Sequence, residues 1–120
     1  MTNTRFPRRV YDAGTEPDPR FTMANERTFL AWIRTALALI AGGVALEALG
    51  LPLQPALRLG ASILLLALGL IAPLLAWRAW SATETALRQN TPLPSSRLAL
   101  LTAVGVTAVA VLIVLGIFLR

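Results

Sequence analysis

Arginine is the side chain in this sequence that is best placed to do chemistry. The chain has 11 basic residues, all of them Arg, and 6 acidic residues, which gives a formal net charge of +5. A guanidinium group stays ionised in almost any setting and binds phosphate or carboxylate groups in a bidentate fork. This composition therefore predicts recognition of anions, either as solutes or as lipid head groups.

Three arginines share one face of a helix if the first apolar segment is helical. Arg20, Arg27 and Arg34 are spaced by seven residues, and each such step drifts by only about 20° around a helix. Small residues continue the same stripe, namely Ala31, Ala38, Ala41, Gly42 and Ala45. The opposite face carries mainly bulky apolar residues, namely Phe29, Trp32, Ile33 and Ile40, with Ala36 among them. We therefore expect one basic face lined by small residues, and one apolar face that packs against lipid or other helices.

Two interpretations of this stripe are open. In the first, Arg20 and Arg27 are membrane-edge charges and Arg34 extends to the membrane surface, while the small residues permit close helix packing. Arg27 would then pair with Glu26 or Glu84. In the second, the stripe lines an aqueous path whose arginines favour anions. Arg34 carries most weight, because it lies roughly 9 Å inside the span and an Arg at the bilayer centre costs about 2.5–3.5 kcal/mol.

The other charged candidates also have a structural and a functional interpretation. Arg78 directly follows the second apolar segment and is either a membrane-edge anchor or part of a basic vestibule. Glu26 is expected to form a salt bridge with a neighbouring Arg and, with Asn25, to fix the start of the first helix. Glu47 is expected at the surface or paired with Arg58, with a cation or proton site as the alternative.

Several classes of chemistry are excluded by composition. The sequence has no Cys and no His, so it offers no thiol nucleophile, thiolate metal site or imidazole base. It also has no phosphate-binding glycine loop, zinc-ligand spacing or nucleophile–base arrangement. We therefore expect no enzyme activity, no metal and no cofactor.

Three apolar segments must position these arginines. Hydrophobic residues make up 56% of the chain and charged residues 14%, whereas about a quarter of a soluble domain is charged. Residues 59–77 and 98–119 carry no charge and reach roughly 28 and 33 Å as helices, enough to cross a hydrocarbon core. Residues 28–51 are also long enough, despite Arg34 and Glu47. The pattern predicts an all-α membrane protein with three transmembrane helices.

The remaining segments set the organisation of the chain. Residues 1–19 are expected to form a mobile or peripheral polar tail, and residues 20–120 the three-helix domain. Residues 81–90 should continue the second helix beyond the membrane, and Ser95 or Ser96 should cap the third. Most arginines lie in the tail and the 78–97 loop, so the positive-inside rule predicts a cytoplasmic N-terminus and a C-terminus outside.

The stretch Phe21–Leu39, FTMANERTFLAWIRTALAL, resembles the signature of the YidH-like family of small bacterial inner-membrane proteins. Its core from Ala24 to Trp32 is the most specific part, and the Trp77–Arg78–Ala79 junction resembles the family as well. The resemblance covers about residues 17–120 and implies a multi-pass protein of the bacterial inner (plasma) membrane.

The same domain is similar to the membrane part of the eukaryotic vacuolar transporter chaperone, which makes polyphosphate and passes it through a pore built from several copies. This similarity implies a homo-oligomeric ring with Arg20, Arg27 and Arg78 at basic pore positions. It also implies that Glu26 supports them through salt bridges. Arg34 departs from the eukaryotic pattern, in which a neutral polar residue is usual. Polyphosphate synthesis is not implied, because the sequence has no counterpart of the soluble polymerase domain.

These observations predict an integral membrane protein that forms an Arg-lined oligomeric pore or binding site for phosphate-like or polyphosphate-like anions. A ring is needed because three helices alone cannot enclose a useful aqueous path. The expected partners are further copies of the chain, anionic lipid and a phosphate-like anion, but not nucleic acid. The alternative is a non-conducting membrane scaffold that binds a partner protein or anionic lipid.

Overall fold

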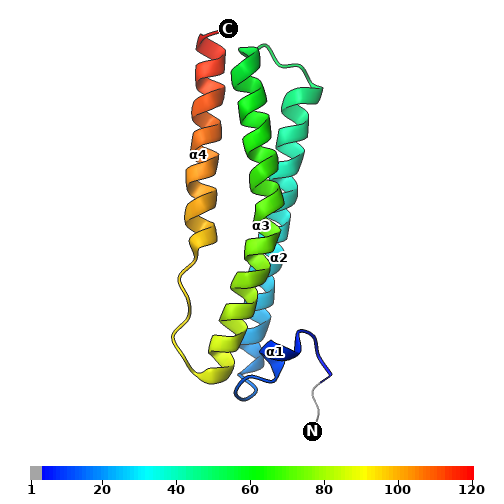
Figure 1. Cartoon of the computed structure of the whole chain (residues 1–120), viewed down its shortest axis with the longest axis vertical. Coiled ribbons are helices and arrows are strands. Elements are labelled where there is room, and N and C mark those ends of the chain that lie inside the picture. The colour runs from blue at the N-terminus through cyan, green and yellow to red at the C-terminus, as the bar shows by residue number, and fades with distance from the viewer. Residues whose placement is uncertain (1–3) are drawn as a thin grey trace.

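Three long helices run side by side in the computed structural model, which describes residues 4–120 (Figure 1). The helices are α1 (Arg8–Tyr11), α2 (Pro19–Ala48), α3 (Pro55–Gln89) and α4 (Arg97–Phe118). The molecule measures 63 × 25 × 20 Å, and α1 lies against one end of the long rod. Each of the three long helices is long and apolar enough to cross a membrane. The all-helical, three-span prediction is therefore compatible with the structure.

Side-chain caps mark where the three long helices begin. The carboxylate of Asp18 accepts a hydrogen bond from the backbone N–H of Arg20 at 2.9 Å. Gln54 and Ser96 cap α3 and α4 in the same way. Each cap satisfies a backbone N–H group that has no partner within its helix. The cap on α4 was predicted from its two serines, and the structure confirms Ser96 in this role.

Helices α2 and α3 both extend beyond the apolar spans at the end of the rod that carries α1. Helix α3 continues to Gln89, as residues 81–90 predict, and α2 begins at Pro19, well before residue 28. We call this the Arg-rich end, because eight of the arginines belong to it: Arg5, Arg8, Arg9, Arg20, Arg27, Arg78, Arg88 and Arg97. The opposite end carries Arg58 and Arg120.

Helix α3 is the central element of the bundle. It packs against both α2 and α4, whereas the backbones of α2 and α4 do not approach each other closely anywhere in the described chain. Two apolar clusters fill the interior. The one nearer the Arg-rich end is built from Ala36, Ala72, Ala76 and Leu98, with Phe29, Trp32 and Leu75 packed on it. The second is built from Leu46, Ala61 and Val109. This layout leaves the outer face of α2 uncovered.

Small residues let α2 and α3 approach closely. A Cβ atom on Gly69 would lie 2.5 Å from Ile40 Cγ1 and 3.1 Å from the carbonyl oxygen of Ala36. Nearer the other end, Ser62 Oγ donates a buried hydrogen bond of 2.6 Å to the carbonyl oxygen of Gly43. Small residues with interhelical hydrogen bonds are the usual contact between membrane helices. The α2–α3 contact therefore fixes the rotation of α2, and with it the direction of the arginine stripe.

Candidate functional site

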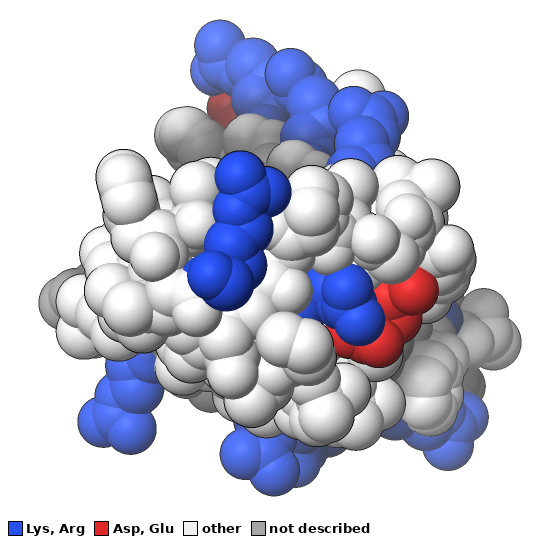
Figure 2. Space-filling view, turned by 90° about the horizontal axis from the view of Figure 1, so that it is seen from above, with Lys and Arg blue, Asp and Glu red and all other residues white. Residues whose placement is uncertain are grey.

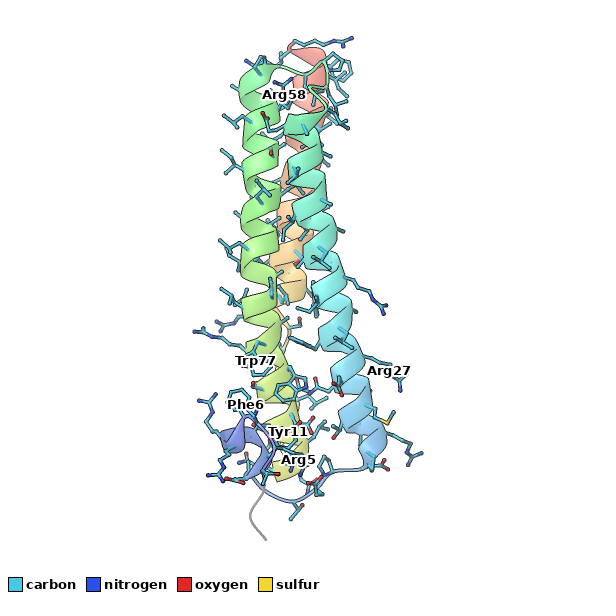
Figure 3. All side chains as sticks on the ribbon, turned by 90° about the vertical axis from the view of Figure 1, so that its right-hand side faces the viewer. Arg5, Phe6, Tyr11, Arg27, Arg58 and Trp77 are labelled. Carbon is cyan, nitrogen blue, oxygen red and sulfur yellow. The ribbon has the colours of Figure 1, made fainter. Side chains whose placement is uncertain are left out.

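The arginine face of α2, formed by Arg20, Arg27 and Arg34, points away from the rest of the protomer. The buried residues of α2 all lie on its other side: Asn25, Ala36, Leu39, Gly43 and Leu46. At about 100° per residue, the centres of the two sets are roughly 145° apart around the helix. All three arginines are exposed, and Arg27 projects away from α3 in Figure 3. The predicted division of this helix into two faces is therefore present.

The three arginines differ in their partners. Arg20 pairs with Asp18, with 2.8 Å between Nη2 and Oδ2. Arg27 and Arg34 form no ion pair or hydrogen bond with any residue in the range 4–120. The pairing of Arg27 with Glu26 or Glu84, which belongs to the first interpretation of the stripe, does not form in the described chain. Glu84 is instead turned into the α2–α3 interface. The guanidinium groups of Arg27 and Arg34 therefore lie on the outside of the described protomer without a carboxylate partner in it.

The predicted salt bridge of Glu26 does not form within the described chain. Its side chain is exposed, and none of the ion pairs among residues 4–120 includes it. The expectation that Asn25 and Glu26 fix the start of the helix is also wrong, because Asp18 caps it seven residues before Asn25. A salt bridge from Glu26 to another copy of the chain stays a prediction.

Arg78 lies on α3 and is not next to the arginine face within the protomer. It is exposed and lines two cavities, neither of which is lined by an arginine of α2. Its membership of a shared basic vestibule depends on how copies assemble and stays a prediction.

A buried polar cluster, formed by Thr22, Asn25, Glu84 and Arg88, lies at the Arg-rich end. Glu84 is fully buried and accepts hydrogen bonds from Thr22 Oγ1 at 2.9 Å and Asn25 Nδ2 at 3.2 Å. Arg88 Nε lies 3.7 Å from Glu84 Oε1. Asn25 also donates to the carbonyl oxygen of Trp80 at 3.1 Å. The cluster joins α2 to α3 beyond the apolar spans, and sequence analysis did not identify it.

Arg88 also holds the N-terminal segment, residues 5–16, against α3. Its Nη1 donates to the carbonyl oxygen of Tyr11 at 3.2 Å, and its guanidinium lies 4.6 Å from the centre of the Tyr11 ring. The backbone N–H of Thr15 donates to the carbonyl oxygen of Arg88 at 2.9 Å, and Val10 is buried. The segment is therefore attached to α3 by specific contacts.

The carboxylate of Glu16 links Arg5 to Arg88 in this attachment. A hydrogen bond from the Arg5 guanidinium holds the pKa of Glu16 below its ordinary value, and the charge of Arg88 adds to this. A carboxyl group with a lowered folded-state pKa stabilises the fold fully above its unfolded pKa, and this stabilisation is lost as the pH falls through the folded value. Because Glu16 is mostly exposed, we expect the contribution to be small.

Glu47 and Arg58 form an ion pair at the other end of the rod. Arg58 Nε lies 3.6 Å from Glu47 Oε1, and Arg58 Nη1 donates to the carbonyl oxygen of Leu51 at 2.8 Å. Figure 2 shows acidic and basic side chains touching at this end. The predicted pairing of Glu47 with Arg58 is confirmed.

Three membrane-length helices, with charges gathered at one end and an uncovered arginine face, define a multi-pass helical membrane protein. Its family follows from comparison with known proteins. The chain belongs to the DUF202 family, described as a domain of unknown function, whose profile matches residues 20–86.

Its relatives are bacterial proteins, and one of them is named as an inner membrane protein. The inner membrane protein YidH of Escherichia coli (strain K12) is 43% identical over 108 residues, which cover 88% of this chain and 92% of that protein. The uncharacterized protein Rv2272 of Mycobacterium tuberculosis (strain ATCC 25618 / H37Rv) is 42% identical over 97 residues, which cover 80% of each chain. No solved structure matches. The resemblance to the YidH-like family is therefore confirmed.

Proposed function

We propose that this protein forms a homo-oligomeric ring in the bacterial inner membrane. In the ring, Arg27 and Arg34 of every copy face a shared axis that conducts or binds phosphate-like anions. One observation carries the proposal: Arg34 lies within an apolar span, on the side of α2 opposite α3, and has no partner in the described chain. The inner-membrane location is supported by the name of the relative YidH.

The energetic argument concerns the surroundings of Arg34. A guanidinium facing lipid at the bilayer centre costs about 2.5–3.5 kcal/mol, and less at shallower depth. A water-filled axis between copies removes that cost, and the exposed Ala31 and Ala38 next to Arg34 permit close approach of neighbouring helices. A ring also gathers like charges, which an anion on the axis would neutralise.

The proposed orientation follows from the distribution of charge. Eight arginines belong to the Arg-rich end and two to the other. The positive-inside rule then puts the Arg-rich end in the cytoplasm and the C-terminus outside. In this orientation the arginine face runs from a cytoplasmic vestibule at Arg20, to which Arg78 adds charge, up to Arg34 inside the membrane.

Anion flux through liposomes containing the full chain tests the proposal. We expect Arg27→Glu and Arg34→Glu each to slow phosphate or sulfate flux roughly fivefold, which corresponds to about 1 kcal/mol, because each reverses a charge on the axis. Arg8→Glu makes the same charge change on exposed α1 and should leave flux unchanged. Equal flux for the wild type and both axial variants would contradict the proposal.

A non-conducting scaffold is the alternative, and the pairing of Arg20 with Asp18 favours it, because it removes one charge from the vestibule. Crosslinking separates the two. The chain has no native Cys, so the double variant Ala31→Cys with Ala41→Cys introduces two thiols on the exposed side of α2, enough to link each copy to two others. Oxidation in native membranes should give oligomers above the dimer if the face surrounds an axis. Monomers alone, or dimers alone, would favour the scaffold.

A further inference from the structure

A cavity of about 360 Å³ lies between α2, α3 and the start of α4, at the level where the apolar spans end. It forms because α3 holds both neighbours while the α2 and α4 backbones stay apart. One wall of the cavity is apolar and includes Phe29, Trp32, Leu75 and Leu98. The other wall carries polar and basic side chains, including Thr28, Ser95, Arg78 and Arg97. The cavity is therefore amphipathic.

Its charge is entirely positive. Among the residues that the structure describes, Arg78 and Arg97 are the charged residues that line it, and no acidic side chain does. Neither arginine forms an ion pair with any residue that the structure describes. Arg97 is also the first residue of α4, where the helix dipole disfavours a positive charge. The helix dipole therefore gives no reason for an arginine at this position, and a bound anion would offset the unfavourable charge.

Aromatic residues place this cavity at the membrane interface. Trp77 stacks on Trp80 with ring centres 5.1 Å apart, and it meets the edge of Phe29 at 6.0 Å. Figure 3 shows Trp77 at the level where the N-terminal segment meets α3. Tryptophan belts lie at the depth of lipid head groups, and Arg78 follows Trp77 directly. We therefore expect the cavity to lie at the boundary between head groups and hydrocarbon.

We propose that this cavity binds an anionic phospholipid from the leaflet at the Arg-rich end. Its phosphate lies between Arg78 and Arg97, and the beginning of one acyl chain follows the wall formed by Trp32 and Leu75. Basic pockets between transmembrane helices are known to bind anionic head groups. Free phosphate would engage the same two guanidinium groups but would leave the apolar wall without a partner.

The site shares Arg78 with the vestibule of the proposed anion path and no other residue. It does not use Arg27 or Arg34, and Arg97 belongs to no part of that proposal. Loss of lipid binding in an Arg97 variant and loss of flux in an Arg34 variant are therefore independent results. Either proposal can fail while the other holds.

Lipid binding by the purified full chain tests the inference. The probe is phosphatidylglycerol, titrated into protein in neutral detergent and followed by native mass spectrometry, with phosphatidylcholine of the same acyl chains as the neutral comparison. We expect Arg97→Gln and Arg78→Gln each to weaken phosphatidylglycerol binding about fivefold, because each removes one charge-assisted contact. Arg8→Gln removes an exposed charge from the same end outside the cavity and should have no effect.

Three results would overturn the inference. One is equal binding of phosphatidylglycerol and phosphatidylcholine, and another is unchanged binding in both cavity variants. The third is displacement of phosphatidylglycerol by inorganic phosphate at a similar concentration, which would identify a site for soluble anions instead. Preference for phosphatidylglycerol, lost in both cavity variants and resistant to phosphate, supports it.

Discussion

Replacing Glu84 with Ala should lower the free energy of unfolding by about 3 kcal/mol, because removal of one partner from a buried ion pair strands the other. Glu84 is fully buried, and its carboxylate accepts from Thr22 and Asn25 of α2 at 2.9 and 3.2 Å. The variant leaves both donors without this acceptor in the α2–α3 interface. An unsatisfied buried polar group costs about 1–3 kcal/mol.

The expected loss of free energy of unfolding is at the lower end of the range for breaking a buried ion pair, because Arg88 has other partners. Its Nη2 lies 3.4 Å from Glu16 Oε2, and its Nη1 donates to the Tyr11 carbonyl oxygen. Glu84→Gln should cost less than Glu84→Ala, since the amide oxygen can still accept from Asn25 while the charge opposite Arg88 is gone.

The loss of free energy of unfolding can be measured in mixed micelles. The fraction of dodecyl sulfate is raised, and unfolding is monitored as the loss of the helical circular dichroism signal. Glu26→Ala is the matched control, because Glu26 is a carboxylate at the same end, exposed and without an ion pair in the described chain. The free energy of unfolding of the Glu26→Ala variant should stay within about 0.5 kcal/mol of the wild-type value. If Glu84→Ala were as stable as Glu26→Ala, the polar cluster would not join α2 to α3.

The sequence predicts the three spans well, because length and the absence of charge are enough to identify a membrane helix. The uncharged segments 59–77 and 98–119 lie within α3 and α4, apart from the last residue of the second. The direction of the arginine face also follows from sequence, because the heptad spacing of Arg27 and Arg34 puts them opposite the bulky side of α2. What they face in an assembly depends on contacts between copies, which a single sequence does not specify.

The polar cluster escaped prediction because Glu84 and Arg88 are spaced as an ordinary pair on a solvent-exposed helix. Their burial comes from distant parts of the chain: α2 extends past its apolar span, and the N-terminal segment covers Arg88. One signal was available. Thr22 and Asn25, three residues apart, lie on the side of α2 opposite Arg20, where polar side chains in a packed face need partners.

The cavity beside Arg97 was also beyond sequence analysis. Arg78 and Arg97 are separated by a helix end and a loop, and only the turn of the chain between Gln89 and Arg97 brings them to one cavity. The positive-inside rule placed both arginines on the cytoplasmic side of the membrane. It did not distinguish an arginine in solvent from one beside an apolar wall.

Replacing Gly14 with Ala should detach the N-terminal segment from α3. Gly14 has a φ of +54°, and a Cβ atom there would lie 2.0 Å from the carbonyl oxygen of Arg88 and 2.5 Å from its carbonyl carbon. Both contacts are with backbone, so no side-chain rotation relieves them. The neighbouring hydrogen bond from Thr15 N–H to the same oxygen would have to break.

Gly50→Ala separates this clash from the cost of the backbone conformation. Gly50 has a φ of +55°, and a Cβ atom there would have no neighbour within 4 Å, so both variants carry the left-handed penalty of about 1–2 kcal/mol. Only Gly14→Ala adds contact with α3. The difference between the two variants therefore reports on attachment of the segment.

Limited trypsin digestion after Arg8 and Arg9 measures that attachment. Detachment should speed cleavage at these sites about tenfold or more, because local opening then no longer limits access, while Gly50→Ala should be cleaved at the wild-type rate. The bundle itself should survive, because the bonds of Glu84 to Thr22 and Asn25 come from α2 and not from the detached segment. Equal cleavage of the two glycine variants would mean that Arg88 does not hold the segment in place.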